Sequence, residues 1–285
     1  MNVSSRLLPL LLLLAVALPA TLRAGAWSQK EGEGMVIENY TFYTTSHVFD
    51  ASGTRVAMSN NGTFQKQELN TYAEYGVTSQ FTLTGNFFAD RYTFGTNNGP
   101  TDTNMGFTNQ EIGGRYQFSG ASGDKDKTTL AQSAQLLFSF PTGYSMTATP
   151  VLGNDEYAIE ADYFIGSPWK NDGTTGFWEA GAGVRFNIGA PSDQLRWWAT
   201  GGVDFSKRWK LITQFSGIHG LGDDKRQTVG NNVTLATDYA LVKSTISAVF
   251  EIDPKWSISF GPTVDLYGVN TGAGYGGQFG VWRRF

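Results

Sequence analysis

Apolar and polar side chains alternate with a period of two in segment after segment of this chain. Between 156 and 165, one parity carries Glu156, Glu160 and Asp162, and the other carries Tyr157, Ile159, Ala161, Tyr163 and Ile165. This alternation is typical of a β-strand with one apolar face. The pattern recurs at 177–188, 195–205 and 257–266, and we therefore expect an all-β protein.

The same pattern predicts twelve strands. An even number is usual for a single-chain bacterial outer-membrane barrel. The less apolar parity is small or charged, and the apolar parity is rich in aromatic residues near the strand ends, as a lipid-facing wall with aromatic girdles requires. We predict a transmembrane antiparallel β-barrel of about 12 strands rather than a soluble sandwich, with strands near 34–47, 65–76, 80–94, 108–118, 130–140, 156–166, 175–188, 195–205, 210–219, 232–252, 256–267 and 275–285.

The connections between these strands fall into two groups. Tight turns are predicted at 76–79, 206–209 and 253–255, and these belong on one side of the membrane. Longer segments rich in Gly, Asn and Asp fit extracellular loops: 48–63, 95–107, 141–155 and 220–231. Two further connections, 119–129 and 167–174, are longer than periplasmic turns usually are.

Residues 1–26 are predicted to be a secretory signal. Arg6 precedes a leucine-rich apolar stretch at 7–20, which is too short to span a bilayer of about 30 Å as a helix. Small residues place the cleavage after Ala24 or, in an A-x-A arrangement, after Ala26. The barrel domain then covers 27–285. Its net charge is −6 rather than −4, because Arg6 and Arg23 leave with the signal.

The composition narrows the chemistry further. The chain has no cysteine, which excludes disulfides, thiolate metal sites and a cysteine nucleophile. A net charge of −4 argues against a nucleic-acid partner, because phosphates require a basic face. The 35 glycines accompany many aromatic residues and few prolines, which indicates close-packed strands rather than disorder. We expect neither a metal nor a cofactor.

The polar parity places a mixed set of charges inside the barrel, with an acidic excess. Two interpretations stay open: ion pairs that fill and stiffen the barrel, or a polar passage for sugars or small cations that also involves Tyr72, Phe88, Tyr92 and Trp198. A barrel of twelve strands lies between the filled eight-stranded barrels and the open sixteen-stranded porins. The candidate lumen-lining residues are Glu68, Glu74, Asp90, Glu111, Arg115, Glu160, Asp162, Glu179, Arg185, Arg196, Asp204, Lys243, Glu251 and Asp265, with Arg284 near the end of the chain.

The last eight residues, 278–285, resemble the carboxy-terminal assembly signal of outer-membrane barrels. Gln278, Gly280 and the terminal Phe285 match its polar, glycine and aromatic positions. The resemblance implies that the barrel-assembly machinery recognises this strand. Arg283 departs from the pattern at a position that is normally hydrophobic, and we expect its long stem to reach the periplasmic headgroups.

A second resemblance concerns the first third of the chain, which is similar to the outer-membrane proteins called XagA. The resemblance implies a role in surface polysaccharide display or biofilm, as an export conduit, and brings no catalytic residues. Barrels from phenol-degradation and fatty-acid-uptake clusters have similar turns, so an uptake channel stays open. The residues that carry the resemblance are Ala26–Gln29, Gly32, Gly34, Val36, Ile37, Phe49, Asp50, Gly53, Tyr72–Thr78 and Glu111–Tyr116.

Three functions are therefore carried forward for a protein of the cell outer membrane. The first is a channel or export conduit for polysaccharide or small polar solutes, or an uptake porin for aromatic or sugar molecules. The second is an adhesive surface protein acting through loops 48–63 and 220–231. The third, an outer-membrane hydrolase, needs a serine beside His47 or His219, and no nucleophile motif surrounds either histidine; we therefore predict no enzyme activity.

Overall fold

A computed structural model describes residues 25–97, 99–120, 130–222, 227–229, 233–235 and 238–285. It contains almost only strands and one short 3-10 helix. None of the described residues forms a helix long and apolar enough to cross a membrane. The elements are β1 (Gly34–Thr45), β2 (His47–Phe49), β3 (Arg55–Ala57), η1 (Ser59–Asn61), β4 (Thr63–Gly76), β5 (Phe81–Gly95), β6 (Asp102–Phe107), β7 (Gln110–Ser119), β8 (Ala131–Phe140), β9 (Ala158–Asn171), β10 (Thr174–Asn187), β11 (Gln194–Asp204), β12 (Trp209–Gly220), β13 (Gln227–Val229), β14 (Val233–Leu235), β15 (Ala240–Glu251), β16 (Trp256–Val269), β17 (Thr271–Gly272) and β18 (Tyr275–Arg284).

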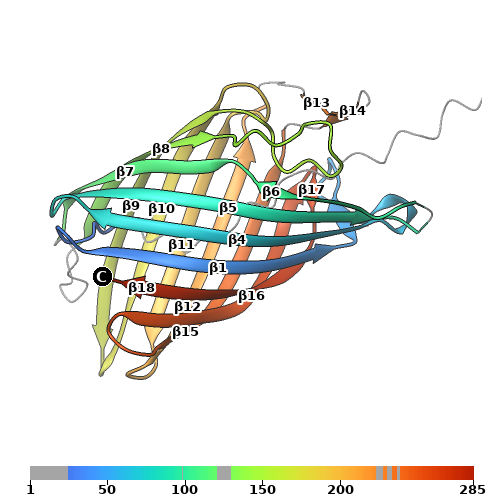
Figure 1. Cartoon of the computed structure of the whole chain (residues 1–285). Coiled ribbons are helices and arrows are strands. Elements are labelled where there is room, and N and C mark those ends of the chain that lie inside the picture. Colours follow the sequence, from blue (N-terminus) through green and yellow to red (C-terminus); the bar gives the residue numbers. More distant parts are fainter. Residues whose placement is uncertain (1–24, 98, 121–129, 223–226, 230–232, 236–237) are drawn as a thin grey trace, which may run out of the picture.

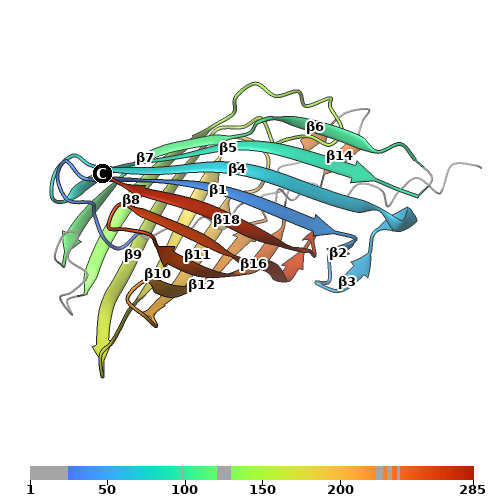
Figure 2. The ribbon, with the colours of Figure 1, turned by 60° about the horizontal axis from the view of Figure 1, so that its bottom comes forward.

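The strands close into a twelve-stranded antiparallel barrel (Figure 1). Around the wall the order is β4, β1, β18, β16, β15, β12, β11, β10, β9, β8, β7 and β5, and the pairing of β4 with β5 closes the ring. β6 and β7 share one position in the wall, because β7 pairs with the first half of β5 and β6 pairs with its second half. Figure 2 shows β18, the last strand, between β1 and β16. The predicted fold class is confirmed.

Burial follows the predicted alternation. In β9, residues at one parity are buried, and the other parity exposes Ile159 and Tyr163. Large apolar side chains are exposed all round the wall, which is the surface that hydrocarbon covers in a membrane barrel. The orientation of β1 is also clear: Ile37 and Asn39 face inward, and Tyr40 and Phe42 face outward.

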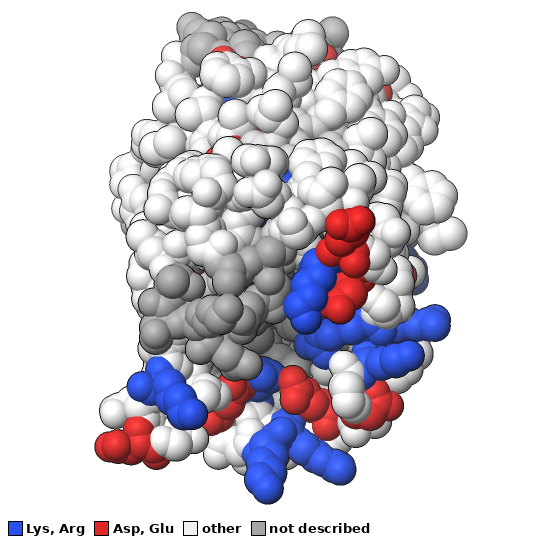
Figure 3. Space-filling view, turned by 90° about the vertical axis from the view of Figure 1, so that its left-hand side faces the viewer, with Lys and Arg blue, Asp and Glu red and all other residues white. Residues whose placement is uncertain are grey.

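The two ends of the barrel differ as predicted. One end, which we call the turn end, carries the short connections at 77–80, 172–173, 205–208 and 252–255, together with the longer connection between β7 and β8; the other, the loop end, carries the long connections at 46–62, 141–157 and 221–239. In outer-membrane barrels the short turns face the periplasm. Figure 3 looks at the turn end, where Lys, Arg, Asp and Glu side chains gather, while the rest of the visible wall is almost free of charge.

Three predicted boundaries need correction. Residues 167–174 are not a long connection, because β9 and β10 continue to Asn171 and Thr174 and meet in a tight turn at Asp172 and Gly173. Both turn residues have positive φ values, 44° and 81°, as such a hairpin turn requires. The predicted loop 95–107 contains β6, and the predicted strand 232–252 contains the separate strands β14 and β15. Residues 121–129 lie outside the described part of the chain.

Candidate functional site

All fourteen predicted lumen residues lie on the inner face of the barrel. Twelve of them are at most 9% exposed. The other two, Asp204 and Glu251, have side chains that are about one third exposed, at 30% and 31%. The aromatic residues predicted beside them, Tyr72, Phe88, Tyr92 and Trp198, are buried as well. Most of these groups therefore pack against one another and have little contact with water.

One cluster of buried charges ties together strands that are not neighbours. Arg185 of β10 donates through Nε to Glu160 of β9 at 2.5 Å and through a second nitrogen to Glu111 of β7. Arg196 of β11 lies 3.1 Å from the same Glu160 carboxylate and donates to the side-chain oxygen of Gln194. Four wall positions are thus joined across the interior.

A second pair lies nearer the turn end. Arg115 of β7 donates to a carboxylate oxygen of Glu74 on β4 at 2.7 Å, reaching across β5. Tyr72 donates to the same carboxylate oxygen. Gln29, which precedes β1, donates to the other oxygen at 2.5 Å. Glu74 therefore binds both the wall and the segment before the first strand.

A third cluster fills the half of the barrel near the loops. Lys66 lies 2.5 Å from Glu68 and 3.8 Å from Asp90. Lys243 of β15 lies 3.8 Å from Asp265 of β16, which also accepts the hydroxyl of Tyr43 on β1 at 2.6 Å. Buried ion pairs persist only where each charge has close partners, because the desolvation cost is otherwise too high.

The loop end of the interior is apolar and includes residues of the connection 141–157. Leu152 packs against Tyr43, Phe64 and Tyr92 of the wall, with Met58 from η1's N-cap position. The Tyr144 hydroxyl binds the Asn109 side chain and accepts from the Asp155 amide at 2.7 Å.

Two loop residues outside the spanning strands have shifted pKa values. Burial raises the pKa of the Tyr144 hydroxyl. The exposed Asp50 carboxylate has a lowered pKa, mainly because it accepts the Ser52 hydroxyl at 2.6 Å, and further because it accepts the Thr54 amide at 3.0 Å. These contacts hold a compact turn after β2.

The barrel wall is interrupted at Thr108 and Asn109, between β6 and β7. There the side-chain amide of Gln110 replaces part of the backbone ladder. Its oxygen accepts the Phe88 amide at 2.7 Å, and its nitrogen donates to the carbonyls of Phe88 (2.9 Å) and Thr108 (2.8 Å). A side chain that is 5% exposed thus adds hydrogen bonds to backbone groups where the strand ladder is interrupted.

The interior also holds a segment of the chain that the sequence did not place there. Residues 25–33, which we call the inner segment, precede β1 at the turn end; residues 25–28 are buried inside the barrel, and residues 30–33 are exposed. Ala26 is 0% and Trp27 4% exposed, and the Trp27 ring meets Phe177 edge-on at 6.0 Å between centroids. Phe164 and Trp198 complete this apolar contact. The adjacent Ala26–Gln29 motif was noticed only as part of a family resemblance.

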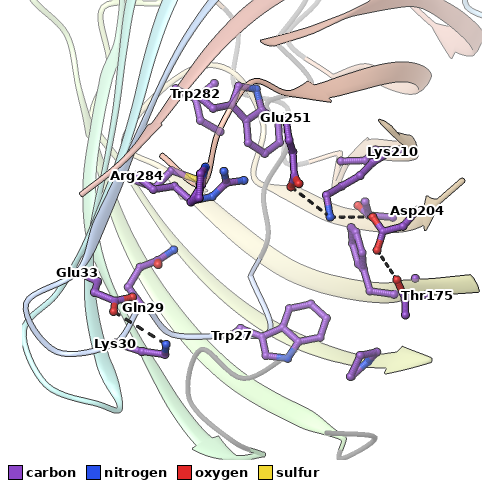
Figure 4. Close-up of a pocket in the computed structure, with 18 of the residues that line it drawn as sticks. Trp27, Gln29, Lys30, Glu33, Thr175, Asp204, Lys210, Glu251, Trp282 and Arg284 are labelled. Carbon is purple, nitrogen blue, oxygen red and sulfur yellow. Dashed lines mark hydrogen bonds and ion pairs between the residues drawn. The ribbon is translucent and has the colours of Figure 1, made fainter. Parts of the chain in front are cut away.

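A cavity of about 760 Å³ lies between the inner segment and the opposite wall, at the turn end (Figure 4). Trp27, Phe177, Ile212 and Trp282 give it apolar surface, and Lys210 is among its charged residues.

Its ionic group centres on Lys210. The ammonium lies 2.7 Å from Asp204 and 3.4 Å from Glu251, and Asp204 also accepts the Thr175 hydroxyl at 2.5 Å. Figure 4 shows these side chains on the wall facing Trp27. Asp204 and Glu251 were predicted from strand parity, but Lys210 was missed because it stands at the second position of its strand, where the alternation is not yet evident.

The carboxy-terminal residues occupy defined places in the seam between β1 and β18. Gln278 faces inward and donates to the Ser247 hydroxyl at 2.7 Å. A Cβ at Gly280 would lie 2.6 Å from the Ser259 hydroxyl, which would have to move to admit a larger residue. Phe285 exchanges two backbone hydrogen bonds with Gly34. Arg283 points outward at the turn end, with its guanidinium 5.3 Å from the Trp256 ring centroid.

The two histidines lie at the loop end, as predicted. His47 Nδ1 is 3.0 Å from the Ser46 hydroxyl, and this contact is exposed to solvent. His219 is exposed near the end of β12. Among the described residues, neither imidazole ring is paired with a carboxylate, and no group of three or more His, Asp and Glu side chains is placed to hold a metal ion.

Comparisons with known proteins bear on the fold. No family model and no curated protein matches the chain. The COG4313 outer membrane channel from Pseudomonas putida F1 is similar in structure, with a TM-score of 0.70, 12% identity, and coverage of 93% of this chain and 100% of that one. The translocator domain of the autotransporter NalP from Neisseria meningitidis has a TM-score of 0.46 at 12% identity, covering 90% of each chain.

At this level of identity the likeness shows the fold alone, which is that of an outer-membrane β-barrel. The predicted location in the cell outer membrane agrees with this fold and with the apolar outer wall.

Proposed function

We propose that the protein is an outer-membrane channel for small molecules, closed in this conformation, and that the turn-end cavity is part of its path. The cavity is the observation that carries the proposal, because a volume of about 760 Å³ within the barrel suits a single small ligand. The similar Pseudomonas protein is itself described as an outer membrane channel, which supports the same proposal.

The cavity wall also suggests the solute class. Trp27, Phe177 and Trp282 would cover an apolar or aromatic body, while Lys210 with its two carboxylates would meet a charged or polar group. Of the two uptake alternatives, an aromatic molecule with one polar substituent fits this wall better than a sugar, whose surface is polar all round.

Planar-bilayer recording tests the channel proposal. Purified protein should give small, discrete conductance steps, because the buried ion pairs leave little room for water, and the Trp27→Ala variant should give larger ones. Liposomes containing the protein should admit 4-hydroxybenzoate faster than sucrose. Absence of conductance from both wild type and Trp27→Ala would overturn the proposal, and faster entry of sucrose would overturn the solute assignment.

Polysaccharide export and adhesion, which follow from the XagA resemblance, stay separate proposals. Export of a polymer would need the buried cluster around Arg185 to separate, since it joins β10 to β7 across the interior. Adhesion would act through loops 48–63 and 220–231. Deleting both loops should abolish surface attachment and leave solute entry unchanged if the protein is an adhesin; unchanged attachment would exclude this role.

We also propose that the protein is not a hydrolase. The exposed Ser46–His47 contact supplies a hydroxyl and a base, but no acid among the described residues orients the imidazole. We expect no esterase activity from the purified barrel. If activity is found and the double variant His47→Ala, His219→Ala loses it, this proposal is wrong.

A further inference from the structure

Three of the first four residues of the inner segment are bound by polar side chains from three different strands. Ser133 of β8 donates to the Gly25 carbonyl. The Ala26 amide donates to Glu179 of β10 at 2.8 Å. Gln117 of β7 accepts both the amide and the hydroxyl of Ser28, at 2.7 and 2.8 Å. These side chains recognise the backbone of one particular stretch of chain.

The shape of the site is equally specific at Gly25. A Cβ at this position would lie 2.4–2.5 Å from three atoms of the Phe164 ring, which is itself fully buried. The neighbouring Ala26 has no exposed surface. Only glycine therefore fits at residue 25, and the backbone there lies in a closed apolar and polar setting, away from water.

The charge of the interior favours an additional cation. Eight buried carboxylates, including Glu179, stand against five buried basic side chains among the described residues, a balance of −3. A positive group brought into this interior is attracted by the acidic excess, and the attraction is stronger in a medium of low polarity than in water. Glu179 is the carboxylate that already binds the backbone beside Gly25.

We propose that the leader is removed between Ala24 and Gly25, and that the new α-ammonium group of Gly25 is bound inside the barrel by Glu179. A signal peptidase would hydrolyse the peptide bond with one water: the hydroxyl goes to the Ala24 carbonyl carbon, and the proton goes to the Gly25 nitrogen, which takes a second proton from solvent. Consecutive backbone nitrogens lie within about 4 Å of each other, so the ammonium group falls next to the carboxylate that binds Ala26.

The structure thereby distinguishes the two cleavage positions that the sequence left open. Cleavage after Ala26 would remove the Gly25 carbonyl and the Ala26 amide, to which Ser133 and Glu179 are fitted. Cleavage after Ala24 keeps both contacts and adds a charge. The inference depends on the predicted leader and on the inner segment, and it holds whether or not the barrel conducts.

The first test is the intact mass of the mature protein extracted from outer membranes. A chain that begins at Gly25 is expected. A chain that begins at Trp27 would overturn the proposal, as would one that retains the leader.

The second test is the reactivity of the α-amine in the folded protein. At neutral pH, acetylation of Gly25, followed by mass spectrometry of the amino-terminal peptide, should be about tenfold slower in wild type than in Glu179→Gln. Glu33→Gln is the matched control, since Glu33 lies at the exposed end of the same segment, and it should behave as wild type. Equal rates in wild type and Glu179→Gln, fast or slow, would exclude Glu179 as the binding group.

A third measurement covers the case in which Glu179→Gln does not fold. Mature wild-type chain can be acetylated selectively at the Gly25 α-amine while unfolded, at a pH near 6.5 where the lysine ammonium groups react far more slowly, and then refolded in detergent. Loss of the positive charge should release the inner segment, so the Ser28 amide, which donates to Gln117, should exchange with deuterium faster than in unmodified protein. Equal exchange rates in both samples would contradict the ammonium site.

Discussion

Trp27 is the largest side chain by which the inner segment contacts the barrel. It meets Phe177 edge-on and lies against Phe164 and Trp198, and it is almost fully buried. Because these contacts join a separate segment to a wall that is closed by its own strand pairing, their loss should affect the segment and leave the barrel folded.

The variant Trp27→Ala should therefore release the inner segment without unfolding the barrel. Truncation of a buried tryptophan costs about 3–5 kcal/mol. Here this loss weakens the binding of the inner segment to the barrel wall. The expected result is a larger single-channel conductance with an unchanged shift in gel mobility on boiling. Trp256→Ala, on the outer surface of the turn end, is the control and should leave conductance unaltered. A conductance equal to wild type in Trp27→Ala would contradict the role of Trp27.

Gln110 stabilises the wall itself, because its side-chain amide supplies hydrogen bonds between β6 and β7, where the strand is interrupted. The variant Gln110→Ala removes three hydrogen bonds and leaves the Phe88 backbone without these partners. We expect the barrel to lose about 1–3 kcal/mol of unfolding free energy and the Phe88 amide to exchange faster with deuterium. Gln132→Ala, which loses an exposed contact with Tyr163, should change stability much less; equal losses in both variants would argue against this explanation.

At the scale of strands, Arg185 joins β10 to both β9 and β7. Arg185→Ala leaves Glu160 and Glu111 buried with one cation fewer, and breaking such a cluster typically costs about 3–5 kcal/mol. Lys30→Ala breaks an exposed pair with Glu33, which is worth about 0–1 kcal/mol. Urea unfolding, followed by the loss of the faster-migrating folded band, should separate the two variants clearly. Similar midpoints would show that the Arg185 cluster contributes little.

The strands themselves were predictable because the two faces of the wall contact different media. Lipid on one side and packed polar groups on the other force a period of two, which a single sequence displays directly at Ile159 and Glu160. The ends of the strands were less predictable, because there the two faces of the wall no longer contact different media. In the hairpin 167–174, Pro168 and Gly173 resemble a loop in sequence, yet Pro168 pairs with Phe177 in a ladder that projects beyond the neighbouring turns (Figures 1 and 2).

Which charges meet inside the barrel could not be predicted from parity. Parity gives the face of each side chain, whereas the Arg185–Glu111 contact depends on closure of the ring and on the register of four strands. The inner segment was missed for a similar reason. Nine residues before the first strand show no alternation, and only the closed barrel creates the space that Trp27 fills.

For the molecule as a whole, closure depends on the seam between its first and last strands. β1 and β18 pair along ten residues, and the seam ends with the two hydrogen bonds between Gly34 and Phe285. The Phe285 ring is half exposed beside Gly34 at the turn end, where barrels place an aromatic girdle. The terminal residue thus contributes to the closed structure, apart from any recognition by the assembly machinery.

Deleting Phe285 should reduce the amount of closed barrel recovered from outer membranes. Two backbone hydrogen bonds are worth about 1–3 kcal/mol together, which is too little to abolish the fold. If the last strand acts as the assembly signal that its resemblance implies, loss of Phe285 would add a separate defect in cells. Refolding in detergent separates the two effects: the deleted chain should refold nearly as well as wild type in vitro, yet assemble poorly in cells if the machinery reads this residue. Phe285→Tyr keeps the ring and the backbone and should assemble normally. Equal yields of the deleted chain and wild type in cells would mean that this strand carries no such signal.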